Sequence, residues 1–340
     1  MPASPDHLPD LSLAGPYLRA IADCISASGA NARTLLSRNG IDPAAIDDAA
    51  LELPLTSFAH LLRDAIMTTG EPALGLLVGD RLGVTSHGTL GAAILRGTTL
   101  REVARLLVDQ LDARAPLVGL DVVQSENEFR LLVRDALPRG QMRRALLEAV
   151  VVALAKLIEA IAQGTTAIIR IAFDDRTPPY SNFARALLHR PVRWGESFTG
   201  LVLPACQIDL PLHGGDPVAF AALIRRAEQE LASQAGDRPV STALHRLLLG
   251  RRGGLPSLPA AARLLQLQPR SLHRRLVDEG TTFRVVVEEV RATLAREYLA
   301  EPDWTVPEIA LALGYADPAN FRRALRRWRL NGSRRSIHVG

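Results

Sequence analysis

The chain has 340 residues, of which 47% are hydrophobic and 22% charged, and its formal net charge is +4. This length exceeds one ordinary hydrophobic core and predicts two or three domains. The hydrophobic fraction excludes a disordered chain. The two cysteines, Cys24 and Cys206, are too few for a disulfide framework or a cysteine zinc site.

The basic residues are distributed unevenly along the chain. All but Lys156 are arginines, a usage that indicates a GC-rich genome rather than a function. Residues 241–340 hold 17 arginines against 9 acidic residues, a net charge of +8, whereas residues 1–240 have a net charge of −4. A basic C-terminal part indicates nucleic acid as its partner.

The N-terminus has no signal-peptide pattern, and the most apolar stretch, residues 149–155, is too short to cross a bilayer. We therefore expect a cytoplasmic protein without a membrane partner. Residues 1–15, which contain three prolines, predict a flexible tail. Hydrophobic periodicity and turn residues then predict helices at 16–28, 32–38, 56–68, 72–81, 90–95, 100–111, 139–162, 178–189 and 217–233.

Five strands are expected among these helices, at 117–124, 128–133, 166–173, 192–194 and 201–203. Residues 16–235 thus predict one helix-rich α+β domain. The helix at 139–162 is apolar on every side, which places it in the domain core or against a second copy. The polar segment 234–239 marks the boundary to a C-terminal domain, residues 236–340.

The C-terminal domain contains the pattern of a helix-turn-helix unit. Thr305 and Glu308 have the spacing of a capping box, and the helix that they begin is expected to end before Gly314. Asp317 and Pro318 are suited to begin a second helix, which extends to about Trp328. Two short helices joined by a tight turn predict DNA binding.

A second copy of this pattern lies upstream, with helices at 260–265 and 269–278, after a short helix at 242–249. One long helix, 283–300, connects the two units and spans about 27 Å at 1.5 Å per residue. A connector of that length can hold two reading helices about one DNA turn apart. We therefore expect an all-α domain with two helix-turn-helix units joined by a long helix.

Helical periodicity divides each reading helix into an inner and an outer face. Leu272 and Leu276 point inward in the first helix, and Phe321, Leu325 and Trp328 in the second. Arginine grips phosphate or reads guanine, and asparagine reads adenine. An arginine-rich helix can also be a solvated face, but two such units favour DNA. The candidate DNA contacts are Arg270, Ser271, His273, Arg274, Ala319, Asn320, Arg322, Arg323 and Arg326.

The stretch from Leu258 to Trp328 resembles the double helix-turn-helix domain of AraC/XylS-type transcriptional regulators. The resemblance is carried by Pro269-Arg-Ser-Leu-His-Arg-Arg-Leu276 and by Ile309-Ala-Leu-Ala-Leu-Gly-Tyr315 followed by Asn320-Phe321-Arg-Arg-Ala-Leu-Arg-Arg-Trp328. The front domain is similar to the ligand-binding region of the branch with ornithine-responsive and virulence regulators. That similarity rests on Glu71-Pro-Ala-Leu-Gly-Leu76, Gly88-Thr-Leu-Gly91 and Pro191-Val-Arg-Trp194.

The chain departs from this family pattern in two places. Gln266 and Gln268 stand where the family has a turn glycine and a capping serine, and glutamine is a poor N-cap. Residues 331–337 lack the proline and tyrosine that the family has after its second unit. Packing of this closing segment is therefore expected to differ from the family.

Other chemistry has little support in the sequence. The eight histidines, including His87 and His213, lack metal-ligand spacing, no phosphate-binding loop or nucleophile elbow occurs, and both cysteines are expected to be buried and inert. We expect no metal, no cofactor and no enzyme activity.

The resemblance implies a regulator of promoter DNA with a small-molecule effector, a homodimer and a contact with RNA polymerase. The alternative is a sensor whose basic domain mainly contacts a protein.

Overall fold

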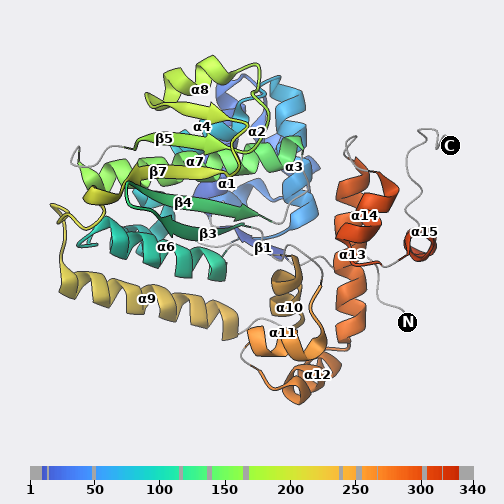
Figure 1. Ribbon diagram of the computed structural model, residues 1–340. Helices are drawn as coiled ribbons and strands as arrows, with labels where there is room; N and C mark the ends of the chain where they lie inside the picture. The colour runs from blue at the N-terminus through green and yellow to red at the C-terminus, as the bar shows by residue number, and fades with distance from the viewer. Residues whose placement is uncertain are drawn as a thin grey trace. The chain divides into compact units, whose positions relative to one another are not determined.

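The computed structural model describes residues 10–13, 15–47, 51–114, 118–135, 140–163, 168–236, 240–249, 255–265, 267–300, 305–315 and 317–328. These residues form two compact units (Figure 1). The front domain covers the described residues from Asp10 to Gly236, and the C-terminal domain begins with the helix at Val240. The predicted boundary segment overlaps residues 237–239, which lie outside the described residues, so its position stays a prediction.

The front domain is rich in helices, as its periodicity predicts, and it also holds three short 3-10 turns. Its α-helices are α1 (Gly15–Ala27), α2 (Ala32–Arg38), α3 (Leu55–Thr69), α4 (Leu74–Arg81), α5 (Gly88–Ile94), α6 (Leu100–Arg114), α7 (Gln141–Ala162), α8 (Ser181–Leu188) and α9 (Pro217–Gly236). The 3-10 turns are η1 (Pro43–Asp47), η2 (Val84–His87) and η3 (Ala205–Gln207). The nine α-helices match the predicted ones with shifts of a few residues at their ends, and α9 continues to Gly236, three residues beyond its predicted end.

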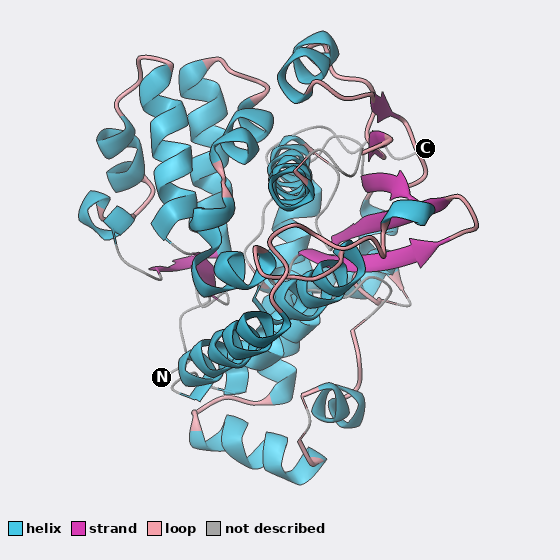
Figure 2. Ribbon diagram, turned by 90° about the vertical axis from the view of Figure 1, so that its left-hand side faces the viewer, coloured by secondary structure: helices cyan, strands magenta, loops and turns pink. Residues whose placement is uncertain are grey.

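Five strands form one mixed sheet in the order β3-β4-β7-β5-β6, with only β5 and β6 parallel. The strands are β3 (Val118–Gln124), β4 (Glu128–Asp135), β5 (Arg170–Phe173), β6 (Val192–Trp194) and β7 (Gly200–Pro204). All five were expected, although the third begins at Arg170, because residues 168 and 169, which were predicted to belong to it, lie outside the strand. Figure 2 shows the strands in magenta among the cyan helices. The fold is thus the expected α+β domain.

Buried and half-buried side chains alternate along β4, so one face of the sheet belongs to the core. Phe129, Leu131 and Val133 are buried, whereas the residues between them are half-buried. Side chains from α6, α7 and β7 meet this buried face, and together they enclose a small cavity with an entirely apolar lining. The opposite face carries ion pairs, such as Glu128 with Arg170 at 2.8 Å. One dry face and one solvated face are typical of antiparallel pairing.

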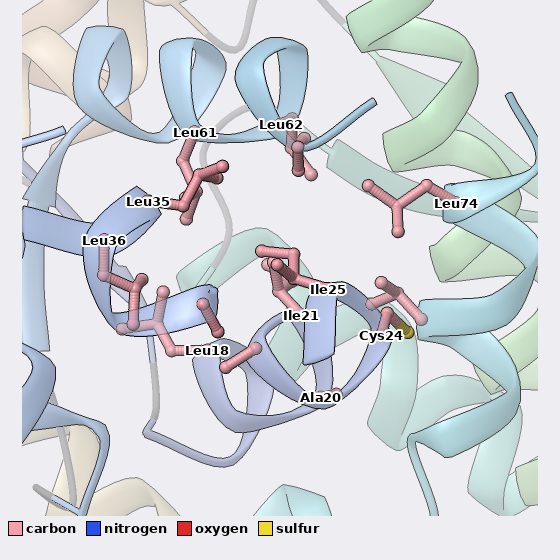
Figure 3. Close-up of a cluster of buried hydrophobic side chains, with 14 of the residues drawn as sticks. Leu18, Ala20, Ile21, Cys24, Ile25, Leu35, Leu36, Leu61, Leu62 and Leu74 are labelled. Carbon is pink, nitrogen blue, oxygen red and sulfur yellow. The ribbon is translucent and has the colours of Figure 1, made fainter. Parts of the chain in front are cut away.

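A second core cluster lies among the first four helices (Figure 3). Leu18, Ile21 and Ile25 on α1 face Leu35 and Leu61, and all five side chains are at most 4% exposed. Their spacing of three and four residues on α1 is the apolar stripe that the sequence shows. The cluster continues through Leu74 on α4 to Ala145 on α7.

The long helix α7 is buried inside its own domain. Val151, Val152 and Leu154 are at most 5% exposed in the single chain. Helices α3 and α4 and strand β7 cover it. The prediction that this helix is buried is confirmed, but it offers no apolar face to a second copy. The alternative prediction, that α7 packs against a second copy, is therefore wrong. Periodicity alone cannot distinguish a core helix from an interface helix.

The prediction of a flexible tail at residues 1–15 is wrong for residues 10–13. Asp10–Leu13 forms strand β1, which pairs antiparallel with β2 (Leu51–Pro54). The alternation of polar and apolar residues in this segment is a strand signal, but the nearby prolines outweighed it in the prediction. Residues 1–9 lie outside the described residues.

The C-terminal domain is all-α among the residues described. Its helices are α10 (Val240–Leu249), α11 (Leu258–Leu264), α12 (Pro269–Asp278), α13 (Phe283–Ala300), α14 (Val306–Ala312) and α15 (Pro318–Arg327). Every helix of this domain was predicted, and the bounds of α12 and α13 coincide with the prediction. Within the described residues, none of the helices is both long and apolar enough to pass through a bilayer.

Candidate nucleic-acid interface

Capping residues set the ends of the helices in the second helix-turn-helix unit. Thr305 caps α14: its hydroxyl accepts from the Glu308 amide, and its own amide donates to the Glu308 carboxylate at 2.8 Å. Hydrogen bonds from the hydroxyl and amide of Thr305 lower the pKa of this exposed carboxyl. Gly314 ends the helix with a φ of +75°, which glycine adopts without strain. Asp317 then caps α15 by accepting from the Ala319 amide at 2.8 Å.

The inner face of α15 is held by an aromatic group. Phe321 is fully buried, and the rings of Tyr315 and Trp328 lie 5.5 Å and 6.4 Å from it. Trp328 and Leu325 are only half-buried, whereas Ala324, which the sequence analysis did not single out, is 3% exposed. The inner face is therefore turned slightly from the predicted one.

The first unit repeats the same backbone pattern. The amides of Leu265 and Leu267 donate to the carbonyls of Ala261 and Ala262, just as those of Leu313 and Tyr315 donate to Ile309 and Ala310 in the second unit. Leu272 and Leu276 are fully buried, as predicted. Gln268 occupies the N-cap of α12 without a side-chain hydrogen bond, which confirms it as a poor cap. Gln266 lies outside the described residues, as do residues 331–337.

Helix α13 connects the two units and carries the domain core. Its 18 residues span about 27 Å. Val286 and Val290 are fully buried, and Glu289 bonds to the buried His245 of α10 at 2.9 Å. The carboxylate of Glu279, just after α12, accepts from the amide of Ser241 at 2.8 Å and so caps α10. The sequence analysis missed this cap, because its two partners are 38 residues apart.

The candidate DNA contacts lie on the outer faces of the two reading helices. On α12 the side chain of Ser271 is half-buried and the other three candidates are exposed; on α15 all five candidates are exposed. The exposed ones are Arg270, His273, Arg274, Ala319, Asn320, Arg322, Arg323 and Arg326. The geometry leaves these side chains accessible, and their contacts with DNA stay predictions.

Two arginines of α15 have different surroundings. Arg323 donates to the side-chain oxygen of Asn320 at 2.7 Å, so both groups share one exposed face. Arg327, in contrast, pairs with Glu288 of α13, which also binds Arg291 at 3.2 Å. Arg291 in turn stacks over the ring of Tyr315 at 4.8 Å. Arg327 therefore fastens the reading helix to the connector.

In the front domain, the strongest polar group surrounds Arg143 on α7. This buried guanidinium bonds to Asp135 and Asp174 at 2.9 Å and to Asp175 at 3.3 Å. Although burial lowers its pKa, the hydrogen bonds that it donates to Asp135 and Asp174 raise it, so Arg143 keeps its charge. This network ties together the ends of β4 and β5, and the described residues contain no cluster suited to a metal ion.

The cysteines differ from each other. Cys24 is buried as expected, and burial raises the pKa of its thiol to about 11. Cys206 is exposed, so the prediction of a buried thiol is wrong there. It lies in the 3-10 turn η3, which contains no buried residue. His87 accepts or donates a hydrogen bond with the Tyr17 hydroxyl at 2.6 Å and is half-buried.

Comparison with known families identifies both domains. The family described as the arabinose-binding domain of AraC transcription regulators, N-terminal, matches residues 29–212, and a helix-turn-helix family matches residues 261–329. The chain belongs to the AraC family of transcription regulators. This AraC-family protein is thus a transcription regulator with a helix-turn-helix domain.

Relatives of the AraC-family chain cover different shares of its length. The ornithine utilization regulator of Pseudomonas aeruginosa is 28% identical over 312 residues, 92% of each chain. The regulator VirS of Mycobacterium tuberculosis is 32% identical over 145 residues, 42% of each chain. The crystal structure of the regulator CdpR from Pseudomonas aeruginosa matches with a TM-score of 0.46 at 22% identity, over 87% of this chain and 93% of that one.

Proposed function

We propose that this regulator binds promoter DNA by placing α12 and α15 in two successive major grooves. The observation that carries the proposal is the pair of helix-turn-helix units with exposed polar and basic faces, joined by a connector of about 27 Å. Arginines around both helices supply phosphate contacts, which give most of the affinity. Direct readout falls to the outer residues of α12 and α15.

The test of this proposal is the substitution Arg323→Ala. Arg323 is exposed and bonds only within its own helix in the described residues, so its loss leaves the fold intact. We expect promoter affinity to fall about 5- to 150-fold, as for the loss of one good base contact. Binding is measured by footprinting and the fold by a melting curve.

Arg225→Ala is the matched control. Arg225 is an exposed arginine on α9 of the front domain, outside the helix-turn-helix units. We expect its removal to leave promoter affinity unchanged. If Arg323→Ala melts like the parent chain and binds the promoter equally well, α15 does not read DNA as proposed.

The front domain is proposed to sense a small molecule that modulates DNA binding. Support comes from its match to a ligand-binding family and from the name of one relative, a regulator of ornithine utilization. Arabinose and ornithine are therefore among the first effectors to test. We also propose a homodimer that contacts RNA polymerase, both drawn from the family resemblance; the dimer surface lies elsewhere than α7.

A further inference from the structure

A buried carboxylate in the front domain has one oxygen without a partner. Glu148 on α7 is 1% exposed. Its Oε1 accepts from the Tyr180 hydroxyl at 2.7 Å, whereas its Oε2 is buried and has no hydrogen-bond partner among the described residues. Folded proteins rarely leave a buried polar atom unpaired, and such an atom often marks a site for water or a ligand.

An opposite charge lies one turn away on the same helix face. Arg144 precedes Glu148 by four residues, a spacing that brings side chains together. Within the described part of the chain the two do not form an ion pair, and the Nε of Arg144 is also buried without a hydrogen bond. Asp175 lies 3.9 Å from Arg144, but it is also engaged by Arg143. Helix α7 thus carries, one turn apart, a buried acceptor atom and a buried donor atom that make no hydrogen bond within the described residues.

Aromatic side chains border this pair. Tyr180 and Trp194 pack together against a small apolar cluster that includes Val152, one turn beyond Glu148. The indole nitrogen of Trp194 is a further buried donor without a partner among the described residues, and its ring stacks on Phe173 at 4.4 Å. The Arg144 side chain is 31% exposed, and Tyr180 and Trp194 are half-buried. The carboxylate therefore lies beneath a rim that solvent reaches.

We propose that Glu148 and Arg144 form the effector site, and that its ligand is a small zwitterion of the amino-acid class. The inference rests on the proposed sensor function. The ligand's ammonium donates to Oε2 of Glu148, and its carboxylate accepts from Nε of Arg144. A plain amine leaves the Nε of Arg144 without a hydrogen-bond acceptor, and a plain acid leaves the Oε2 of Glu148 without a hydrogen-bond donor. The site therefore selects molecules that carry both groups.

Proton release is a signature of this site. Burial raises the pKa of Glu148 to about 8, opposed by the Tyr180 hydrogen bond and the charge of Arg144 and reinforced by the charge of Asp175. The carboxyl therefore binds a proton at pH 7. A ligand ammonium favours the ionised form, so binding at pH 7 releases about one proton. Calorimetric titrations in phosphate and in Tris buffer measure this number.

The experiment is a thermal-shift panel on the full chain with the twenty standard amino acids and L-ornithine, each added singly. We expect at least one to raise the melting temperature, and the matched amine and acid, each lacking one charged group, to bind at least tenfold more weakly. Glu148→Gln and Tyr180→Phe should weaken binding of that amino acid tenfold or more. A panel without any shift contradicts the proposal, as does unchanged binding by Glu148→Gln.

Glu159→Gln is the matched control on the same helix. Glu159 is half-exposed and pairs with Arg190 at 3.0 Å, so its neutralisation should leave ligand binding unchanged. Promoter binding without any amino acid is measured on the same preparations. If the chain binds DNA but no panel member, the effector site fails alone; if it binds an amino acid but no DNA, the proposed function fails and the site stands.

Discussion

At the scale of single residues, a carboxyl group buried as deeply as that of Glu148 makes stability depend on pH. Its pKa is about 8 in the fold, because burial disfavours the charge, against 4.5 for an unperturbed glutamate. Between these values the folded chain binds a proton that the unfolded chain has lost. The free energy of unfolding must therefore fall as pH rises from about 5 to about 8.

Glu148→Gln should remove this part of the pH dependence. Because the glutamine is neutral at every pH, the variant should lose less stability than the parent chain between pH 5 and 8. The difference is at most about 5 kcal/mol, at about 1.4 kcal/mol per pKa unit. Urea unfolding at several pH values measures it, with Glu159→Gln as the exposed control. Parallel curves for parent and Glu148→Gln would show that the carboxyl is already ionised at neutral pH.

At the scale of elements, α4 and α7 approach so closely that only glycine fits between them. A Cβ on Gly75 would lie 2.3 Å from the Ala145 carbonyl oxygen, and one on Gly79 would lie 2.6 Å from that of Ala149. Both distances are shorter than any van der Waals contact. The glycines that could suggest a phosphate loop in the sequence therefore serve helix packing.

Gly79→Ala should consequently destabilise the front domain. The added methyl group meets backbone that cannot yield, and overpacking of this kind costs about 1–3 kcal/mol. The control is Gly83→Ala, where a Cβ meets nothing within 4 Å and φ is −99°. Thermal melting of both variants gives the comparison. Equal melting temperatures for the two variants would mean that α4 and α7 can move apart without a loss of stability.

Elements with strong local signals could be predicted from the sequence. Pro269, Pro318 and Thr305 begin helices and Gly314 ends one, so the C-terminal helices were placed within two residues of their ends. Contacts between distant segments could not be predicted in this way. The bond between Glu148 and Tyr180, 32 residues apart, depends on how α7 and α8 meet, which no local pattern encodes.

In the candidate nucleic-acid interface, too, local features could be predicted from the sequence and contacts between distant residues could not. The outer positions of α12 and α15 follow from helical periodicity and are exposed. Arg327 pairs with Glu288, 39 residues away, and so has a different role from the exposed arginines beside it on α15. Periodicity alone does not predict this difference. Strand β1 was missed because its four residues are too few to outweigh the surrounding prolines.

At the scale of the whole molecule, the net charge of +4 is the sum of two parts with opposite charge. Residues 241–340 carry +8 and residues 1–240 carry −4. DNA binding by the basic half releases counterions, so the affinity should fall steeply as salt rises, by about 0.9 log units per decade of salt for each phosphate contacted. Fluorescence anisotropy on a promoter fragment at 50 to 300 mM salt, about the range where such effects are large, measures the slope. A flat response would favour the alternative, in which the basic domain mainly contacts a protein.

The central claim is that both helix-turn-helix units read DNA at once, and methylation interference tests it most directly. Methyl groups at guanine N7 block the major groove, where α12 and α15 are placed. The account predicts two groups of interfering guanines about one helical turn, or 10–10.5 base pairs, apart on the promoter. Arg323→Ala should erase the group read by α15 and leave the other. A single group of guanines, or none, would contradict reading by both helices.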